Sequence, residues 1–327
     1  MEVLVIGERD VHELLPMRDC IDVMRRAFAG MATSRFVQPA RIIAWQPDRT
    51  GAIAAMPAWL GEPLALGAKL ISVFPQNRQA GMESHQGLVA LFETQHGALR
   101  AILHAGAITA IRTAAVSGLA TRLLANADAG ILAILGSGTQ ARTHLQAMLE
   151  ARRIRTVRVW SRNPENARAF AQQAASEHSS DVTAVDTVRN AVDGAEIVCT
   201  VTGSTAPILE GRWLADGAHV NAVGSSVPPF RELDTEAIVR GKLFVDSRES
   251  ALREPDDIRV PLAEGAIQES DLLADLAQLA SGQHPGRTSK TEITIFKSVG
   301  LAIEDLAAAN AIYERALAEG RGTAIKF

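Results

Sequence analysis

Residues 130–141 constrain the fold of this chain more than any other stretch. Ile131 to Leu135 form an uninterrupted apolar run, as expected of a parallel strand that is buried on both faces. The next residues are Gly136-Ser137-Gly138-Thr139-Gln140-Ala141, and a helical pattern starts within them. Strand, glycine turn and helix in this order form the context of the G-x-G-x-x-A dinucleotide fingerprint. The stretch therefore predicts a Rossmann-type, doubly wound α/β domain that binds a dinucleotide cofactor.

The small residues of the fingerprint give this prediction a physical reason. Gly136 permits the tight turn, Gly138 lets a pyrophosphate approach the backbone, and Ala141 lets the helix pack close to the strand. The first turn of the helix offers free N–H groups and the positive end of the helix dipole to phosphate oxygens. We therefore assign all of residues 136–141 to the cofactor site.

The order of the predicted elements divides the chain into two domains. The chain has 327 residues, and a fingerprint in mid-chain implies a separate domain before it. From residue 126 onward, strand-like and helical segments alternate, which is typical of a parallel sheet. Residues 126–299 are thus assigned to the NAD(P)-binding domain, and residues 1–125 plus 300–327 to a second domain. The strands of the NAD(P)-binding domain are expected over residues 131–135, 156–160, 182–185, 196–201, 218–223, 243–246 and 293–296.

The second domain is expected to be α+β. Its strand-like runs, with a hairpin signal at residues 94–97, indicate a mostly antiparallel sheet. These runs lie at residues 41–45, 52–56, 67–74, 87–92 and 98–103. Helices are expected over residues 19–31, 108–124 and 301–317, and residues 320–324 are expected to form a loop.

Charge and cysteine content exclude several classes of protein. A net charge of −4 without a basic cluster argues against a nucleic-acid partner. Cys20 and Cys199 are far apart, so the chain has neither a disulfide framework nor a zinc spacing, and no metal is expected. Cys199 lies in an apolar run and is expected to be a buried thiol. The apolar run at residues 3–6 is too short for a signal peptide or a membrane span, so a cytoplasmic location without a membrane partner is expected.

The second strand of the nucleotide domain indicates which nicotinamide the chain prefers. In NAD-binding folds this strand usually ends in a carboxylate that binds the ribose 2′-hydroxyl. Here it is followed by Ser161-Arg162-Asn163, and Arg162 offers a guanidinium that suits a 2′-phosphate. NADP(H) is therefore favoured over NAD(H), with these three residues at the cofactor. The alternative is that Arg162 is a solvated loop residue and both cofactors are accepted.

Further motifs resemble those of the ornithine cyclodeaminase/mu-crystallin family along nearly the whole chain. Besides the fingerprint they are Gly67-Ala68-Lys69, Ala110-Ile111-Arg112-Thr113-Ala114-Ala115, Asn221-Ala222-Val223-Gly224, Arg231-Glu232-Leu233-Asp234, Val245-Asp246-Ser247 and Thr294-Ile295-Phe296-Lys297-Ser298-Val299-Gly300. The family includes amino-acid dehydrogenases, ketimine reductases and cyclodeaminases, which move hydride between a nicotinamide and the α-carbon of an amino acid or its imine. The resemblance implies that the second domain binds a small amino or imino acid and pairs its sheet across a homodimer.

The resemblance also implies residue roles. Arg41, Lys69 and Arg112 are expected around the substrate carboxylate, where an arginine clamp fixes the plane of the carboxylate and points the α-carbon at the nicotinamide. Each residue has an alternative. Lys69 could be a strand lysine that faces solvent, and Arg112 could form a salt bridge on its helix. Arg41 could be an ordinary loop arginine. The pocket is expected to include Met56 and also His85, for which a structural role is an equal alternative. The remaining cofactor residues are expected to be Thr113, Val201, Thr202, Val223, Gly224 and Lys297.

Two positions depart from the ornithine cyclodeaminases. Ala54 occupies the position of an acidic residue that binds the distal amine of the substrate, and Ser226 replaces a catalytic Asp. The loss of both carboxylates removes the partner of a side-chain ammonium and a general base. The run Gly224-Ser225-Ser226 followed by Arg-Glu-Leu is similar to the ketimine reductase and alanine dehydrogenase side of the family.

The favoured hypothesis is an NADP(H)-dependent amino-acid dehydrogenase or imine reductase. Arg41 and Arg112 would hold the α-carboxylate, while Lys69, with water or Ser226, supplies a proton or stabilises charge at nitrogen. The substrate would have a small or apolar side chain, because Ala54 cannot pair an ammonium. The alternatives are an ornithine cyclodeaminase with bound NAD+, which yields proline and ammonia, and a protein that only binds NADPH and a small ligand, as mu-crystallin does with thyroid hormone.

Overall fold

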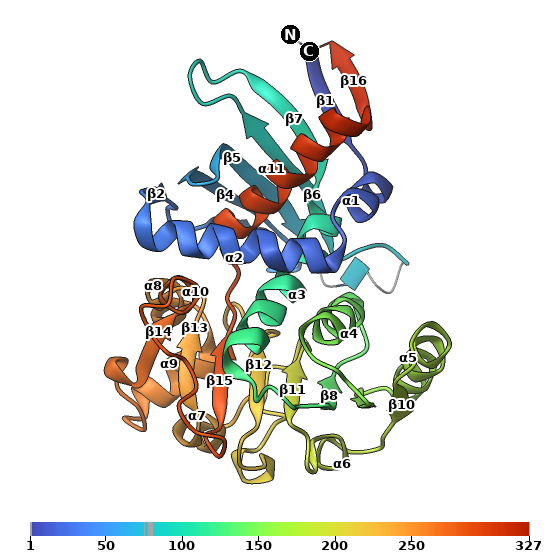
Figure 1. Ribbon diagram of the computed structural model, residues 1–327, viewed down its shortest axis with the longest axis vertical. Helices are drawn as coiled ribbons and strands as arrows, with labels where there is room; N and C mark the ends of the chain where they lie inside the picture. Colours follow the sequence, from blue (N-terminus) through green and yellow to red (C-terminus); the bar gives the residue numbers. More distant parts are fainter. Residues whose placement is uncertain (1, 75, 78–80, 327) are drawn as a thin grey trace. The chain divides into compact units, whose positions relative to one another are not determined.

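The computed structural model describes residues 2–74, 76–77 and 81–326, and the chain forms two compact units (Figure 1). Unit 1 contains the chain up to Thr113 and from Leu301, and unit 2 contains Ala114–Gly300. The first boundary lies inside the helix α3 (Ala105–Leu124) rather than at residue 125, because this helix begins in unit 1 and continues into unit 2. No helix in the described part of the chain has both the length and the apolar character needed to cross a bilayer.

Unit 1 is built on one mixed sheet in the order β16-β1-β7-β6-β5-β4-β2, with β3 paired to β4. The strands from β4 to β7 are antiparallel neighbours, as the sequence predicts. The strands are β1 (Glu2–Ile6), β2 (Phe36–Val37), β3 (Ile42–Trp45), β4 (Ala52–Gly61), β5 (Leu64–Val73), β6 (His85–Phe92), β7 (Leu99–His104) and β16 (Thr323–Lys326). The helices, besides the first part of α3, are α1 (Glu8–Leu14), α2 (Met17–Thr33) and α11 (Ala302–Glu319).

The helices α2 and α11 bury one face of this sheet. α11 packs on β4, β5 and β6, and α2 packs on α11 and on β4 (Figure 1). Along β4, every second residue from Ala52 to Leu60 is buried, which is the period of a strand with one face in the core. Residues of β5 that lie opposite this set therefore also point toward α11.

The C-terminal tail corrects the expectation of a loop at residues 320–324. Thr323–Lys326 form β16, which pairs antiparallel with β1, while β1 pairs in parallel with β7. The tail is short and partly polar, so its strand character comes from hydrogen bonds to β1 and not from its own sequence pattern.

Unit 2 has an eight-stranded sheet in the order β10-β9-β8-β11-β12-β15-β13-β14, and all of its pairs are parallel. The sequence predicts seven of these strands and misses β14. The doubly wound α/β class is confirmed. The strands are β8 (Ile131–Leu135), β9 (Thr156–Trp160), β10 (Asp181–Ala184), β11 (Ile197–Thr200), β12 (His219–Ala222), β13 (Lys242–Val245), β14 (Leu272–Asp275) and β15 (Thr294–Lys297). The helices are α4 (Thr139–Ala151), α5 (Pro164–Glu177), α6 (Val188–Val192), α7 (Thr235–Arg240), α8 (Arg248–Arg253), α9 (Asp256–Ala263) and α10 (Leu276–Ala280).

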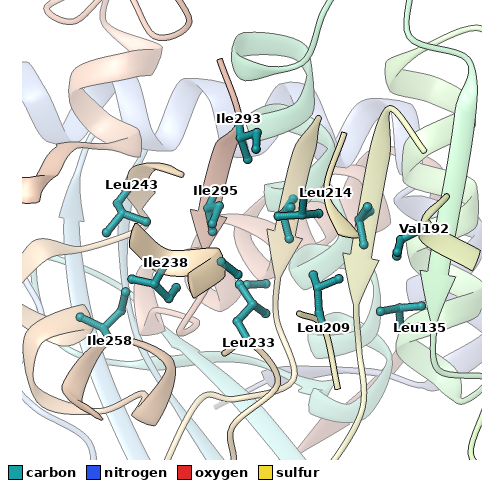
Figure 2. Packing of buried hydrophobic residues seen from close by; sticks show 14 of the residues in the cluster. Leu135, Val192, Leu209, Leu214, Leu233, Ile238, Leu243, Ile258, Ile293 and Ile295 are labelled. Atoms are coloured by element: carbon teal, nitrogen blue, oxygen red, sulfur yellow. The ribbon is translucent and has the colours of Figure 1, made fainter. Parts of the chain in front are cut away.

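A continuous apolar core covers one face of this sheet. Figure 2 shows Leu135 and Ile295 from the strands among side chains of the covering segments, such as Leu209, Leu233 and Ile258. These residues are fully buried, as expected for strands without polar alternation. Cys199 on β11 is a buried free thiol, which confirms its prediction.

The strand order fixes where this unit can bind a ligand. From β8 the chain proceeds through β9 and β10 in one direction, whereas β11 lies on the other side of β8. In open parallel sheets, ligands bind in the crevice beyond the carboxyl ends of the strands at such a reversal. The residues that follow β8, β9, β11 and β12 therefore form the candidate cofactor site of unit 2.

Candidate active site

Lys69 lies on the buried face of the unit 1 sheet. It is opposite Met56 of β4 and Val89 of β6, and only 4% of its surface is exposed. The alternative of a strand lysine that faces solvent is therefore wrong. Because a buried ammonium needs compensating partners, the residues around Lys69 decide its chemistry.

Two carboxylates from the first turn of α11 compensate the buried cations. Asp305 Oδ2 lies 3.0 Å from Lys69 Nζ, and Asp305 Oδ1 accepts a hydrogen bond of 2.9 Å from Arg112 Nε. Arg112 Nη1 donates to Glu304, and Lys69 Nζ also donates to Thr109 Oγ1 at 3.1 Å. The alternative for Arg112 was a salt bridge on its helix. Arg112 does form ion pairs, but its partners are the acids of α11 in the core and not residues on the surface of its own helix.

The cluster shifts the protonation equilibria of its members. Burial lowers the pKa of Lys69 to about 8, the Asp305 carboxylate acts against this effect, and the charges of Arg112 and Arg41 add to it. Burial would raise the pKa of Asp305, but the Arg112 and Lys69 charges hold it below its usual value. Lys69 therefore loses its proton far more readily than an exposed lysine, while Asp305 stays ionised.

The other predicted residues of unit 1 lie at different distances from this cluster. Arg41 immediately precedes β3 and is close enough for its charge to act on Lys69. Met56 is buried directly across from Lys69. Thr113 is buried on α3 next to Arg112 in the chain. His85 is exposed at the start of β6, four residues before Val89, and its Nδ1 lies 3.0 Å from Ser84 Oγ.

Sequence reasoning missed Asp305, Glu304 and Thr109. The available signal was a pair of adjacent acids at the start of an alanine-rich helix, Glu304-Asp305. Acids in the first turn are common on helices because they complement the helix dipole, so this signal does not separate a surface position from a core position. The packing of α11 on β5 is what places these two acids in the core and not on the surface.

In unit 2, the fingerprint has the geometry that a dinucleotide requires. Gly136 has φ +131°, and a Cβ at this position would lie 2.9 Å from the carbonyl oxygen of Val201. Gly138 is the N-cap of α4 and supplies no side-chain cap, so the first N–H groups of this helix remain available. Gln140 Oε1 is buried and has no hydrogen-bond partner within the described part of the chain. This left-handed glycine, the uncapped helix start and the unpaired buried oxygen fit a bound pyrophosphate and its ribose.

The residues after β9 lie beside the fingerprint. Ser137 Oγ donates to Ser161 Oγ at 2.9 Å, so the loop after β8 and the loop after β9 are joined by a hydrogen bond. Arg162 and Asn163 are exposed, and Asn163 Oδ1 caps α5 by accepting from Glu165 N at 3.0 Å. Arg162 is therefore an exposed cation at this edge, whereas the side chain of Asn163 already has a structural role as a helix cap.

A second buried network lies at the carboxyl ends of β11, β12 and β15. Lys297 is buried and pairs with Asp257 at 3.0 Å. Glu232 is also buried and accepts hydrogen bonds from Thr202 N at 2.6 Å and from Gly224 N at 2.7 Å. Ser226, which follows Gly224 in the loop after β12, is half-buried. Glu232 and Asp257 were not predicted as site residues, although Glu232 belongs to one of the motifs that suggested the family.

Within residues 2–74, 76–77 and 81–326, no group of three or more His, Cys, Asp or Glu side chains could hold a metal ion. The possible chemistry comes from the cationic cluster of unit 1 and the dinucleotide geometry of unit 2.

Comparison with known proteins identifies the family. Residues 1–320 match the profile of the ornithine cyclodeaminase/mu-crystallin family. The chain belongs to this family. It is 41% identical over 278 residues to the ketimine reductase mu-crystallin of Mus musculus, and the match covers 85% of each chain.

Solved structures agree over the full length. The Δ1-pyrroline-2-carboxylate reductase of Thermococcus litoralis, solved with NADH and L-proline, superposes with a TM-score of 0.95 at 38% identity, covering 98% of this chain and 99% of that chain. An archaeal alanine dehydrogenase dimer with bound NAD superposes with a TM-score of 0.94 at 30% identity, covering 100% of both chains. The resemblance inferred from the sequence motifs is thus confirmed.

Proposed function

We propose that this protein reduces the C=N bond of small cyclic imino acids with a reduced nicotinamide. The observation that carries the proposal is the buried cluster in which Asp305 joins Lys69 and Arg112. The cluster fits a substrate with an α-carboxylate, and Ala54, buried on the same face of β4, provides no partner for a distal ammonium. L-proline, which the Thermococcus litoralis relative binds, is a cyclic amino acid that has an α-carboxylate and no distal ammonium.

Lys69 and Arg112 keep donors for the substrate carboxylate. A protonated lysine has three N–H donors, and Lys69 uses two of them on Asp305 and Thr109. Arg112 uses Nε and Nη1 on Asp305 and Glu304, and its Nη2 makes no hydrogen bond within the described part of the chain. The two acids therefore orient both cations and leave one edge of each for a ligand, which fixes the imine carbon next to the carboxylate.

A bound reduced nicotinamide supplies the hydride that adds to the imine carbon. Lys69, with water, would supply the proton that the nitrogen requires when the imine enters in its neutral form. A lysine with a pKa of about 8 is a suitable donor near neutral pH, because it is largely protonated and still releases its proton readily. Gly136–Ala141, with Thr202 and Gly224, would hold the dinucleotide.

We propose further that NADP(H) is preferred to NAD(H). Arg162 is exposed beside the Ser137–Ser161 contact, and residues 160–163 contain no carboxylate to bind a ribose 2′-hydroxyl. A guanidinium at this position attracts a 2′-phosphate. The two solved relatives carry NADH and NAD, so the preference requires a direct measurement with both cofactors.

A homodimer through the unit 1 sheet is the third part of the proposal. Within this unit the helices α2 and α11 pack on one face of the sheet, and the other face carries the row Ile42, Ala55, Leu70 and Leu88. Ile42 is 67% exposed, and Ile53 on the same face is 52% exposed. Contiguous apolar surface of this kind marks an interface, and the alanine dehydrogenase relative is a dimer.

The test is an assay of the purified protein with Δ1-pyrroline-2-carboxylate and Δ1-piperideine-2-carboxylate, each with NADPH and with NADH. We expect oxidation of the reduced nicotinamide with these imines, and no proline or ammonia from ornithine. Ornithine turnover without imine reduction would overturn the proposal in favour of a cyclodeaminase. Cofactor binding without turnover of any α-imino acid would indicate a binding protein.

A further inference from the structure

Glu232 is a buried carboxylate to which the proposed reaction gives no part. It is fully buried, and it follows Arg231 in the loop that leads to α7. Isolated buried carboxylates are costly, so a fully buried glutamate must be compensated by hydrogen bonds or charges. The partners of Glu232 are therefore informative about its role.

Four donors from two loops converge on this carboxylate. Oε1 accepts from Thr202 N at 2.6 Å and from Thr202 Oγ1 at 2.7 Å. Oε2 accepts from Gly224 N and from Thr200 Oγ1, both at 2.7 Å. Thr200 is the last residue of β11 and Thr202 lies in the loop after it, whereas Gly224 follows β12, so one side chain joins the carboxyl ends of two neighbouring strands.

The packing at Gly224 is as close as backbone permits. A Cβ on this residue would lie 2.0 Å from Thr202 O and 2.5 Å from Glu232 Oε1. The glycine is thus required because the carboxylate and the β11 loop occupy the space of a side chain. The relative position of the two loops depends on Glu232 directly.

Glu232 is itself held by the network around Asp257. The backbone N–H groups of Glu232 and Leu233 donate to Asp257 Oδ1 at 2.8 and 3.0 Å. Asp257 Oδ2 accepts from Lys297 at the end of β15, which pairs with β12. The carboxylate is therefore anchored to a third strand of the same sheet.

We propose that Glu232 is a positioning residue for the nicotinamide half of the cofactor, acting through Thr202 and Gly224. This inference rests on the proposed function. Gly136, which packs against Val201, belongs to the pyrophosphate end of the site, and the loops after β11 and β12 extend the same edge of the sheet away from the adenine side at β9. Glu232 sets these two loops without contributing to the fingerprint.

The amide variant Glu232→Gln discriminates this role from simple space filling. A carboxylate can accept on both oxygens, but the amide nitrogen of Gln must face either Thr202 N or Gly224 N, and a backbone N–H cannot reverse to accept. One loop must then move or lose its hydrogen bond. The matched control is Glu236→Gln, an exposed glutamate on α7.

The experiment measures dissociation constants of full-length variants for NADPH, NADH and 2′-phospho-ADP-ribose, which lacks nicotinamide, together with kcat for the imine. Glu232→Gln should weaken binding of the reduced dinucleotides by about tenfold or more, lower kcat, and leave 2′-phospho-ADP-ribose binding within about twofold. Glu236→Gln should match the wild type in every measurement.

Other results overturn the inference. Equal weakening of the nicotinamide-containing and nicotinamide-free ligands would show a general loss of the site, and unchanged binding would show no positioning role. If Glu232→Gln does not fold, Thr202→Val must show the same selective loss and Thr202→Ser must restore it. A wild type that binds no dinucleotide would refute the proposed function as well, whereas an active wild type with an indifferent Glu232→Gln variant refutes only the positioning role.

Discussion

Lys69 Nζ lies 3.0 Å from Asp305 Oδ2, and both side chains are buried although the two residues are 236 positions apart in the chain. The contact joins strand β5, which lies between β4 and β6, to the first turn of α11. It gives Lys69 a partner that keeps it charged while burial favours its neutral form.

Removal of the Asp305 charge should change the pH dependence of imine reduction. The carboxylate stabilises the ammonium form of Lys69, so Asp305→Asn lowers the pKa of Lys69 further below about 8. The protonated form is then lost earlier as the pH rises, and the alkaline limb of kcat/KM should move to lower pH by about one unit or more. Asp128→Asn, an exposed position, serves as control. An alkaline limb that stays in place would disconnect Asp305 from the reaction.

Lys69→Met should abolish turnover and preserve cofactor binding. The variant removes a carboxylate ligand and proton donor from unit 1 but leaves the fingerprint intact, so kcat should fall by about 10²- to 10⁴-fold. The dissociation constant for NADPH, followed by the fluorescence of the reduced nicotinamide, should remain that of the wild type. Lys242→Met replaces an exposed lysine at the start of β13 and should behave as the wild type. Residual activity above a tenth of the wild-type value would contradict a chemical role for Lys69.

Gly136→Ala should impair both cofactor binding and folding stability. The added Cβ meets the carbonyl oxygen of Val201 at 2.9 Å, and the backbone has φ +131°. We expect the free energy of unfolding, measured in urea, to fall by about 1–3 kcal/mol, and dinucleotide affinity to fall at least about tenfold. Gly194→Ala is the matched control, because Gly194 has φ +64° but no atom within 4 Å of an added Cβ. It should lose about 1–2 kcal/mol of stability and no affinity; equal affinity losses would remove the argument for close approach at Gly136.

Arg162→Ala tests the cofactor preference. If Arg162 meets a 2′-phosphate, its loss removes charge-assisted hydrogen bonds of about 1.5–3 kcal/mol, and KM for NADPH should rise roughly ten- to hundredfold. KM for NADH should change little, since NADH has no 2′-phosphate. Arg168→Ala, an exposed arginine of α5 paired with Glu165, should affect neither constant. Equal effects on both cofactors would refute the preference.

Ile53→Lys should convert the proposed dimer to a monomer. The substitution places a charge on the exposed apolar face of the unit 1 sheet, where desolvation in an interface would be costly. Leu317→Lys changes an equally exposed residue, 52% accessible on α11, and should leave the oligomeric state unchanged. Light scattering after size exclusion measures both. A wild type that elutes as a monomer, or an Ile53→Lys dimer, would exclude this face as the interface.

The sequence by itself determined those parts of the protein in which local pattern and local structure coincide. The run from Ile131 to Ala141 specified a buried strand, a glycine turn and a helix, because each depends on residues adjacent in the chain. The alternation after residue 126 predicted the parallel sheet for the same reason. Motif order identified the family.

Tertiary structure alone decided which partners the buried charged residues meet. Lys69 and Asp305, or Glu232 and Gly224, meet only because strands and helices pack, and the local pattern around an acid is the same on a surface as in a core. The strand β16 could likewise not be predicted from its own sequence, because its hydrogen bonds go to β1 at the opposite end of the chain. Burial, which sets the pKa of Lys69 and requires four donors on Glu232, is a property of the packed protein and not of the sequence around each residue.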